Sequence, residues 1–391
     1  MSSDEIYDPL SEQSHTDPYP SYAVLRQHAP VYYCAHRQVW ALSRYDDVQA
    51  ALRDWENFSS AQGVEMAEYV GFFGRGNFLE MDPPEHDVTR RLLATRFSSR
   101  SIKSYEPIVR ECAEDILRSL PKAGLVDLGT GFTQQLPVLT ICRLLGLPED
   151  EIRSTVDKTT EMMRRPAGQD RPSPHAEAVR KDLCDLFEEL VAVRGDGSSH
   201  DDILGDIAKG VSSGLIDRSD VAGMCLLLIV AGMETTSSLL GNVIYALANG
   251  EISREQVLDG HGRMSVAATD EFLRHDSPVQ WLCRVTTADV RIHNVVIPAG
   301  ERVLLLYGSA NRDDEVFQSP NELQFDRGSM RNLAFGDGIH FCLGMPLAKL
   351  EARVGVEVLA TNYSAFTTHD RPTRYPSHII RGYETIPVLV R

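Results

Sequence analysis

Apolar residues recur every three or four positions along most of the chain, and this spacing predicts amphipathic helices. The helical pattern covers residues 20–29, 45–53, 85–97, 104–119, 149–163, 175–193, 218–249, 265–275 and 344–361. The alternation typical of strands is rarer. It predicts a hairpin from 31–33 and 39–42, a small sheet from 285–297 and 302–306, and a last hairpin within 378–390. We therefore expect a mainly α fold, a large helical domain with small β-sheets.

Two stretches rich in proline, glycine and polar residues, 164–174 and 195–202, interrupt this pattern. Both are short enough to be surface loops rather than linkers between domains. No other change in composition divides the 391 residues. The sequence therefore predicts one continuous domain spanning residues 1–391.

Composition and charge indicate the compartment of the protein and exclude some classes of binding partner. The N-terminus has no apolar core like that of a secretory signal, and the apolar run 224–233 is too short to span a bilayer, which favours a buried helix. The seven cysteines show no paired pattern, as is typical of a reducing compartment. A net charge of −17 disfavours nucleic acid and anionic membranes. We expect a cytoplasmic protein that binds neither.

The segment 335–344 has the order F-G-x-G-x-H-x-C-x-G and is the strongest chemical signal in the chain. Glycines at three positions let the backbone fold closely around a sulfur atom, with N–H groups turned towards it. The helix expected to begin directly afterwards places its positive end near Cys342 and favours the thiolate. Phe335 can shield that sulfur from water. A lone cysteine in a glycine-rich turn can equally be a small buried hydrophobe.

Six matched positions within ten residues resemble the signature loop of the cytochrome P-450 superfamily. The resemblance implies the cytochrome P-450 fold, a large helical domain with small antiparallel β-sheets. It further implies that Cys342 ligates the iron of haem b, and that Phe335 and Gly336 belong to the cofactor-binding loop.

Upstream of this loop, Glu271 and Arg274 form an E-x-x-R pair on a predicted amphipathic helix. Residues three apart share one helix face, although such pairs are common on solvated helices. The resemblance implies that this pair braces the haem-binding core, with a third basic residue from the following segment. Arg327 is our candidate for that residue.

The predicted helix 218–249 contains A-G-M-E-T-T at 231–236. A threonine hydroxyl there can bond a carbonyl one turn back, and Gly232 opens space beside it. The alternative is a crossing of small residues with a solvated glutamate. The run resembles the distal-helix motif of the family, which implies that Thr235 steadies iron-bound peroxide and that Glu234 relays protons from solvent.

Haem carries two propionates, which favour cationic or imidazole partners. His86 and Arg90 are spaced to share one face of a helix that opens after two prolines. They resemble the family's H-x-x-x-R element, and by the same resemblance Arg284 and His340 are further propionate contacts. Four more basic residues, Arg91, Arg96, Arg100 and Lys103, have no such match. They serve either plain solvation or docking of an acidic electron donor.

The favoured function is a haem-thiolate monooxygenase that inserts one oxygen atom of dioxygen into a small hydrophobic organic substrate, by hydroxylation or dealkylation. The resemblance implies electrons from NAD(P)H through ferredoxin and ferredoxin reductase. The apolar segments 63–78, 278–281 and 379–380 are candidate pocket walls. Two alternatives stay open: a peroxygenase or haem-thiolate coupling enzyme, and a haem sensor without turnover.

Overall fold

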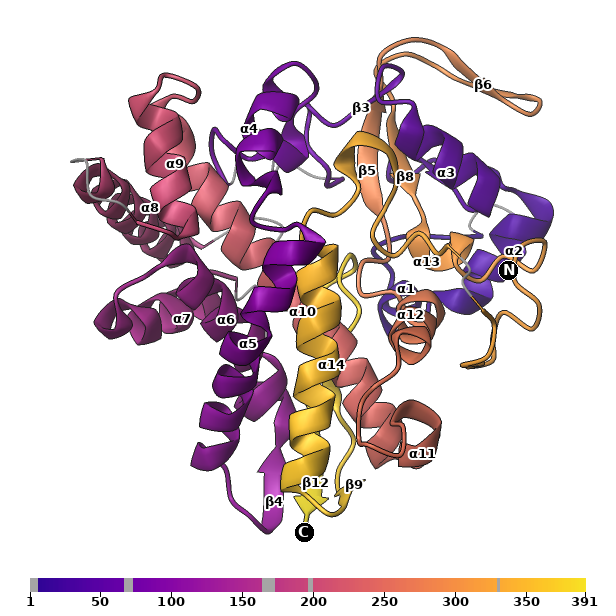
Figure 1. Cartoon of the computed structure of the whole chain (residues 1–391). Coiled ribbons are helices and arrows are strands. Elements are labelled where there is room, and N and C mark those ends of the chain that lie inside the picture. Colours follow the sequence, from indigo (N-terminus) through magenta and orange to yellow (C-terminus); the bar gives the residue numbers. More distant parts are fainter. Residues whose placement is uncertain (1–5, 67–72, 164–172, 196–199, 329–330) are drawn as a thin grey trace. The chain divides into compact units, whose positions relative to one another are not determined.

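The computed structural model describes residues 6–66, 73–163, 173–195, 200–328 and 331–391. The chain separates into two compact units, each assembled from distant segments. Unit 1 comprises Met1–Val70, Val266–Cys342 and Arg374–Gly382, and unit 2 comprises Gly71–Ser265, Leu343–Thr373 and Tyr383–Arg391. The single continuous domain expected from the sequence stays a prediction. Figure 1 shows the helices and strands by label.

Unit 1 contains a five-stranded sheet in the order β1 (Val31–Cys34), β2 (Val39–Leu42), β8 (Arg302–Leu305), β5 (Leu282–Thr286) and β3 (Phe58–Ser59). Neighbouring strands are antiparallel except β2 and β8, which are parallel. The predicted hairpin of β1 and β2 is confirmed. A separate hairpin joins β6 (Val290–Ile292) to β7 (Val295–Ile297).

Unit 1 also contains helices, some of which cover apolar residues of this sheet. The helices are α1 (Glu12–Thr16), α2 (Tyr19–His28), α3 (Tyr45–Arg53), α12 (Val266–His275), α13 (Tyr307–Ala310) and the short 3-10 helix η4 (Gly338–His340). Helix α3 buries Val48 and Leu52 in a cluster with Val303 and Leu305 of β8 and with Phe317. This apolar face fixes α3, whose polar face is then free to contact other segments.

Unit 2 is built around α10 (Val221–Ala248), which packs against α6 (Gln135–Leu145), α8 (Pro174–Arg194) and α14 (Met345–Asn362). Helix α14 also runs beside α5 (Ser99–Ser119) (Figure 1). The other helices are η1 (Phe78–Glu80), α4 (Glu85–Ala94), η2 (Gly129–Thr133), α7 (Glu149–Met163), α9 (Ile203–Ser212), η3 (Arg218–Asp220) and α11 (Arg254–Val257). Strands β4 (Gly124–Asp127), β12 (Pro387–Val390) and β9 (Phe366–Thr368) form a three-stranded antiparallel sheet.

The apolar run 224–233 is part of a helix much longer than the sequence pattern of that run indicates. Among the described residues, Arg218–Ala248 is the one stretch long and apolar enough to cross a membrane, and 78% of its most apolar window is buried inside the protein. The length argument against a membrane span is therefore wrong for the complete helix. Its burial supports the prediction of a core helix.

The structure also corrects the pattern at the C-terminus and in the middle of the chain. The expected hairpin within 378–390 is wrong, because β11 (Tyr383–Thr385) and β12 belong to different sheets. Besides short helices of up to five residues, α6 and α9 have no counterpart among the predicted ranges. Eight of the eleven residues of α6 are buried, so it carries few polar residues that would mark an amphipathic period.

Candidate functional site

The loop that ends at Cys342 is folded by local backbone hydrogen bonds in unit 1. The Cys342 N–H donates to the Phe335 carbonyl at 3.0 Å, and the Gly336 N–H donates to the Leu333 carbonyl at 2.9 Å. Gly336 and Gly338 have φ angles of 67° and 68°, a region that glycine enters without strain. A Cβ on Gly338 would lie 2.3 Å from the Leu52 carbonyl oxygen. Glycine is therefore required at 338 by space as well as by backbone conformation.

The cysteine of this loop differs in exposure from most of the others. Cys34, Cys112, Cys142, Cys225 and Cys283 are buried, whereas Cys342 is half-buried. The four residues that precede it, from Gly338 to Phe341, are also half-buried although three of them carry large side chains. A partly accessible thiol in this position can ligate a soft metal centre that is carried by a large apolar group.

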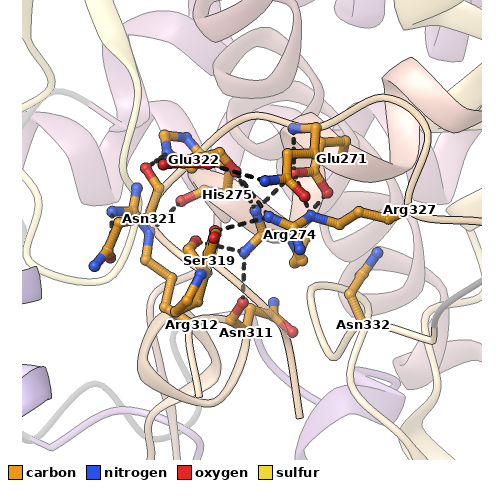
Figure 2. Close-up of polar contacts among 12 residues, drawn as sticks. Glu271, Arg274, His275, Asn311, Arg312, Ser319, Asn321, Glu322, Arg327 and Asn332 are labelled. Atoms are coloured by element: carbon orange, nitrogen blue, oxygen red, sulfur yellow. Dashed lines mark hydrogen bonds and ion pairs between the residues drawn. The ribbon is translucent and has the colours of Figure 1, made fainter. Parts of the chain in front are cut away.

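Arg274 and Arg327 both lie within hydrogen-bonding distance of Glu271, as Figure 2 shows. Arg274 donates to both oxygens of Glu271 at 2.7 and 2.8 Å, and Arg327 Nε donates to Oε1 at 2.9 Å. Burial opposes ionisation of Glu271, but hydrogen bonds from Arg274, the Gln324 N–H and Arg327 lower its pKa. The carboxylate therefore stays ionised between the two guanidinium groups.

Arg274 also holds the irregular segment that leads towards the cysteine loop. It donates to the carbonyl oxygens of Asn311, Pro320 and Glu322 at 3.0, 2.7 and 3.0 Å. Figure 2 shows two of these residues, Asn311 and Glu322, beside the guanidinium group of Arg274. A single buried ion pair thus ties α12 to three points of the chain.

Arg284, in β5, is a buried arginine without a carboxylate partner. Only 3% of the residue is exposed, and its guanidinium group hydrogen-bonds the Cys283 carbonyl at 2.7 Å and the hydroxyl of Tyr307. Among the described residues, no carboxylate oxygen lies within the 4.0 Å of an ion pair with it. A buried guanidinium group normally needs an anion. This donor set fits a carboxylate such as a haem propionate.

The remaining expected propionate contacts are divided between the two units. In unit 2, His86 and Arg90 lie one turn apart on α4, where His86 is 1% exposed and Arg90 is half-buried. The His86 Nδ1 atom lies 2.9 Å from an Asp87 carboxylate oxygen. In unit 1, His340 ends the short helix η4 and is half-buried.

Helix α10 is more exposed at 231–235 than along most of its length. Twenty-one of its twenty-eight residues are buried, but Ala231 is exposed and Gly232, Glu234 and Thr235 are half-buried. A Cβ built on Gly232 would meet no atom within 4 Å. The Thr235 hydroxyl donates to the Ala231 carbonyl at 2.6 Å. An alcohol and an acid therefore lie beside open space on an otherwise buried helix.

Two of the expected pocket walls meet in unit 1. The Gln280 N–H donates to the Ile379 carbonyl at 2.8 Å, and Val279 forms a bridge with Ile380. The third wall, 63–78, includes residues 67–72, which lie outside the described residues.

The four basic residues between positions 91 and 103 differ in exposure and in their ion pairs. Arg96 is half-buried and pairs with Asp201 and Asp206, so it serves internal packing. Arg91, Arg100 and Lys103 are exposed. In the part of the chain that the structure describes, none of these three takes part in an ion pair with an acidic residue.

A second group of metal-ligating side chains lies in unit 1, where Asp8, Cys34 and His36 bring one ligand atom each within 4.8 Å of one another. Arg37 contacts both carboxylate oxygens of Asp8, at 2.9 and 3.0 Å. The charge of this carboxylate is therefore already balanced without a metal ion.

Comparison with known proteins decides the family. The model of the cytochrome P450 family matches residues 22–127 and 264–382. This chain belongs to that family. It is 33% identical, over 98% of its length and 96% of the relative's, to the vitamin D(3) 25-hydroxylase of Pseudonocardia autotrophica. It is 31% identical to the cytochrome P450 monooxygenase PikC of Streptomyces venezuelae, over 97% and 92% of the two chains.

Solved structures of other P450s agree with the fold. The crystal structure of CYP109E1 from Bacillus megaterium in complex with testosterone superimposes with a TM-score of 0.84, at 28% identity and over 97% and 99% of the two chains. The predicted mainly α cytochrome P450 fold is confirmed. This P450 is an oxidoreductase of the monooxygenase class, and its family uses a haem-thiolate cofactor.

The structure thus groups the predicted site residues into two sets. Unit 1 carries Cys342, Phe335, Gly336, His340, Arg284, Glu271 and Arg274, and unit 2 carries His86, Arg90, Glu234 and Thr235. Sequence reasoning missed Tyr307, which hydrogen-bonds Arg284 and whose pKa burial raises, with Arg284 opposing. It also left the acidic residue of the loop, Asp337, without a role. Neither has a local sequence signal, because Arg284 is distant from Tyr307 in the chain, and Gln49 and Arg53 are distant from Asp337.

Proposed function

We propose that this P450 hydroxylates or dealkylates a small hydrophobic organic molecule, with haem b ligated by Cys342. Electrons come from NAD(P)H through a ferredoxin and its reductase, and the protein acts in the cytoplasm. The observation that carries the proposal is the open segment 231–235 of α10, where Thr235 and Glu234 remain accessible on a helix that is otherwise buried.

The residues of unit 1 would hold the cofactor. Cys342 would supply the thiolate ligand, from a loop whose backbone is held by the hydrogen bonds of the Gly336 and Cys342 N–H groups. Arg284 and His340 would hold propionate through charge-assisted hydrogen bonds. His86 and Arg90, on α4 of unit 2, are the further propionate contacts that the resemblance implies. The bound haem supplies the oxygen-activating chemistry that no side chain can perform.

Thr235 and Glu234 would manage protons in this reaction. In the structure the Thr235 hydroxyl donates to the Ala231 carbonyl at 2.6 Å, so its oxygen keeps lone pairs that can accept a proton-bearing partner. Glu234 is half-buried, which leaves its carboxylate able to exchange protons with solvent while it stands next to the alcohol. An acid and an alcohol in this order favour proton delivery over simple ligand sensing.

The substrate proposal draws on relatives and on the wall residues. One relative is named for hydroxylation of vitamin D(3), and one related structure contains testosterone. Both molecules are largely apolar and contain fused rings. Val279, Ile379 and Ile380 offer apolar surface of the same character. We therefore propose an apolar ring-containing substrate, and we place hydroxylation of such molecules ahead of other reactions.

Substrate-dependent dioxygen uptake tests the proposal. The holoenzyme is supplied with NADPH, a surrogate ferredoxin and its reductase, and each compound of an apolar panel that includes vitamin D(3), testosterone and small aromatic compounds. A compound that shifts the ferric spin state should also raise dioxygen uptake and yield an oxygenated product. Product formation with hydrogen peroxide alone, at an equal rate, would support a peroxygenase instead. Spin shifts without any dioxygen uptake across the panel would support a sensor.

A further inference from the structure

Asp337 is a buried acidic residue in the middle of the cysteine loop, between Gly336 and Gly338. Only 4% of it is exposed. One carboxylate oxygen accepts from Gln49 Nε2 at 3.1 Å and from Arg53 at 3.0 and 3.1 Å. The other accepts from Arg331 at 2.7 Å and from the Gly338 N–H at 2.8 Å. Four different residues therefore converge on one carboxylate, which is more than charge balance requires.

Three of the contacts to this segment come from one face of α3. Tyr45, Gln49 and Arg53 are four residues apart and so lie in a row along that face. The Tyr45 hydroxyl donates to the Arg331 carbonyl at 2.7 Å, directly upstream of the loop. The adjoining face of α3 is fixed by buried Val48 and Leu52, in a cluster that also includes Tyr45. The row is thus a rigid support, because the helix that carries it cannot shift without exposing its core face.

The backbone of the loop rests on the same helix. Besides its clash with the Leu52 carbonyl, a Cβ on Gly338 would lie 3.0 Å from the Cα of Arg53. The loop therefore approaches the last turn of α3 as closely as a glycine permits, and Asp337 is the side chain that holds it there.

The charges around Asp337 do not cancel. Arg53 and Arg331 are 52% and 57% exposed in their side chains, whereas the Asp337 side chain is 6% exposed. The Arg331 guanidinium group also lies 5.9 Å from the ring centroid of Phe341, the neighbour of Cys342. The buried carboxylate is screened less than either arginine. Its charge consequently has the larger influence on anything bound at the end of this loop.

We infer that Asp337 is a positioning residue for Cys342: anchored by Gln49, Arg53 and Arg331, it fixes the loop on α3 and its charge lowers the reduction potential of the bound haem. This inference rests on the proposed ligation by Cys342. Reduction adds an electron, so a nearby buried negative charge disfavours the reduced state and a positive charge favours it. The carboxylate and the two arginines therefore act in opposite directions.

The test compares the reduction potentials of holoenzyme variants measured by spectroelectrochemical titration without substrate. Asp337→Asn should shift the midpoint potential to a more positive value. Arg53→Gln should shift it to a more negative value and by less, because that guanidinium group is half exposed. Arg53→Lys keeps the charge and should restore the wild-type potential. Asp8→Asn removes a comparable aspartate–arginine pair of the same unit and should leave the potential unchanged.

Hydrogen exchange on the apoprotein gives a second readout that needs no cofactor. Peptides covering 331–342 should exchange faster in Asp337→Asn than in the wild type, while peptides of β1 and β2 should not change. Because the Arg53 side chain is exposed, its variants should fold even if Asp337→Asn does not. The reduction potential of Arg53→Gln then tests the inference by itself.

The outcomes separate this inference from the proposed function. If the wild-type protein lacks the reduced carbon monoxide band of a thiolate ligand, ligation by Cys342 itself is wrong. If that band is present but the potentials of Asp337→Asn and Arg53→Gln equal the wild-type value, or move in the same direction, Asp337 has only a structural role and the inference is overturned.

Discussion

The cysteine loop of unit 1 and the 231–235 segment of α10 in unit 2 are held in opposite ways. Asp337 alone receives hydrogen bonds from four residues, and Gly338 is packed against backbone. In the segment 231–235, a Cβ on Gly232 would meet no atom within 4 Å, and the Thr235 hydroxyl donates to a carbonyl of its own helix. The comparison teaches that the ligand-bearing loop is fixed in advance, whereas the proposed proton-handling segment leaves room for small molecules.

The largest effect should come from removing the anion that anchors unit 1. Glu271→Gln leaves Arg274, only 2% exposed, and Arg327 without their carboxylate. Breaking a buried pair in this way costs about 3–5 kcal/mol. The variant should lose that much unfolding free energy in urea and retain little haem.

Asp314→Asn is the matched control, because Asp314 is an exposed acid of the same unit. It should change the unfolding free energy by less than about 0.5 kcal/mol. Equal losses in the two variants would contradict the anchoring role of Glu271.

Replacing the hydroxyl of Thr235 tests the proposed proton-handling segment of α10. Thr235→Val removes a proton donor and acceptor but keeps the shape of the side chain, so product formation should fall roughly 10²-fold. The carbon monoxide spectrum and the thermal midpoint should stay as in the wild type. Dioxygen uptake and product formation are measured together. Uptake without product would show that electrons still reach dioxygen but that proton delivery no longer leads to product.

A pair of glycine variants sharpens the contrast directly. Gly338→Ala forces a Cβ to 2.3 Å from the Leu52 carbonyl oxygen at a φ of 68°, which should cost about 1–3 kcal/mol. Gly232→Ala meets no atom within 4 Å and should stabilise the helix by up to about 1 kcal/mol. It should nevertheless weaken ligand binding, because the new methyl group enters the open space. Thermal unfolding and ligand-induced spin shifts measure the two effects. Equal stability of both variants would refute the contrast.

A smaller effect concerns acid stability. The pKa of Glu271 is lower in the folded protein than its ordinary value of 4.5. Its contribution to stability is therefore present above the unfolded pKa and is lost as the pH falls through the folded pKa. The unfolding free energy should decrease below about pH 4.5, and this decrease should be shallower in Glu271→Gln. Identical pH profiles would show that Glu271 does not couple folding to protonation.

Local motifs explain what the sequence could predict. Cys342, Glu271 and Arg274 stand in short motifs that resemble those of the family, and Arg327 follows in the irregular segment upstream of the cysteine loop. The partners of Asp337 could not be found in this way, because Gln49 and Arg53 are separated from it by 288 and 284 residues. Pairing of β12 with β4 is equally long-range, so alternation alone suggested a local hairpin that does not exist.

The spectrum of the reduced protein with carbon monoxide tests the central claim most directly. Ligation by the Cys342 thiolate predicts a strongly red-shifted Soret band in the wild type. Cys342→Ser should lose that band even where the variant still binds haem. A wild-type protein that binds haem without the band, or a Cys342→Ser variant that keeps it, would contradict the assignment of Cys342 as the ligand.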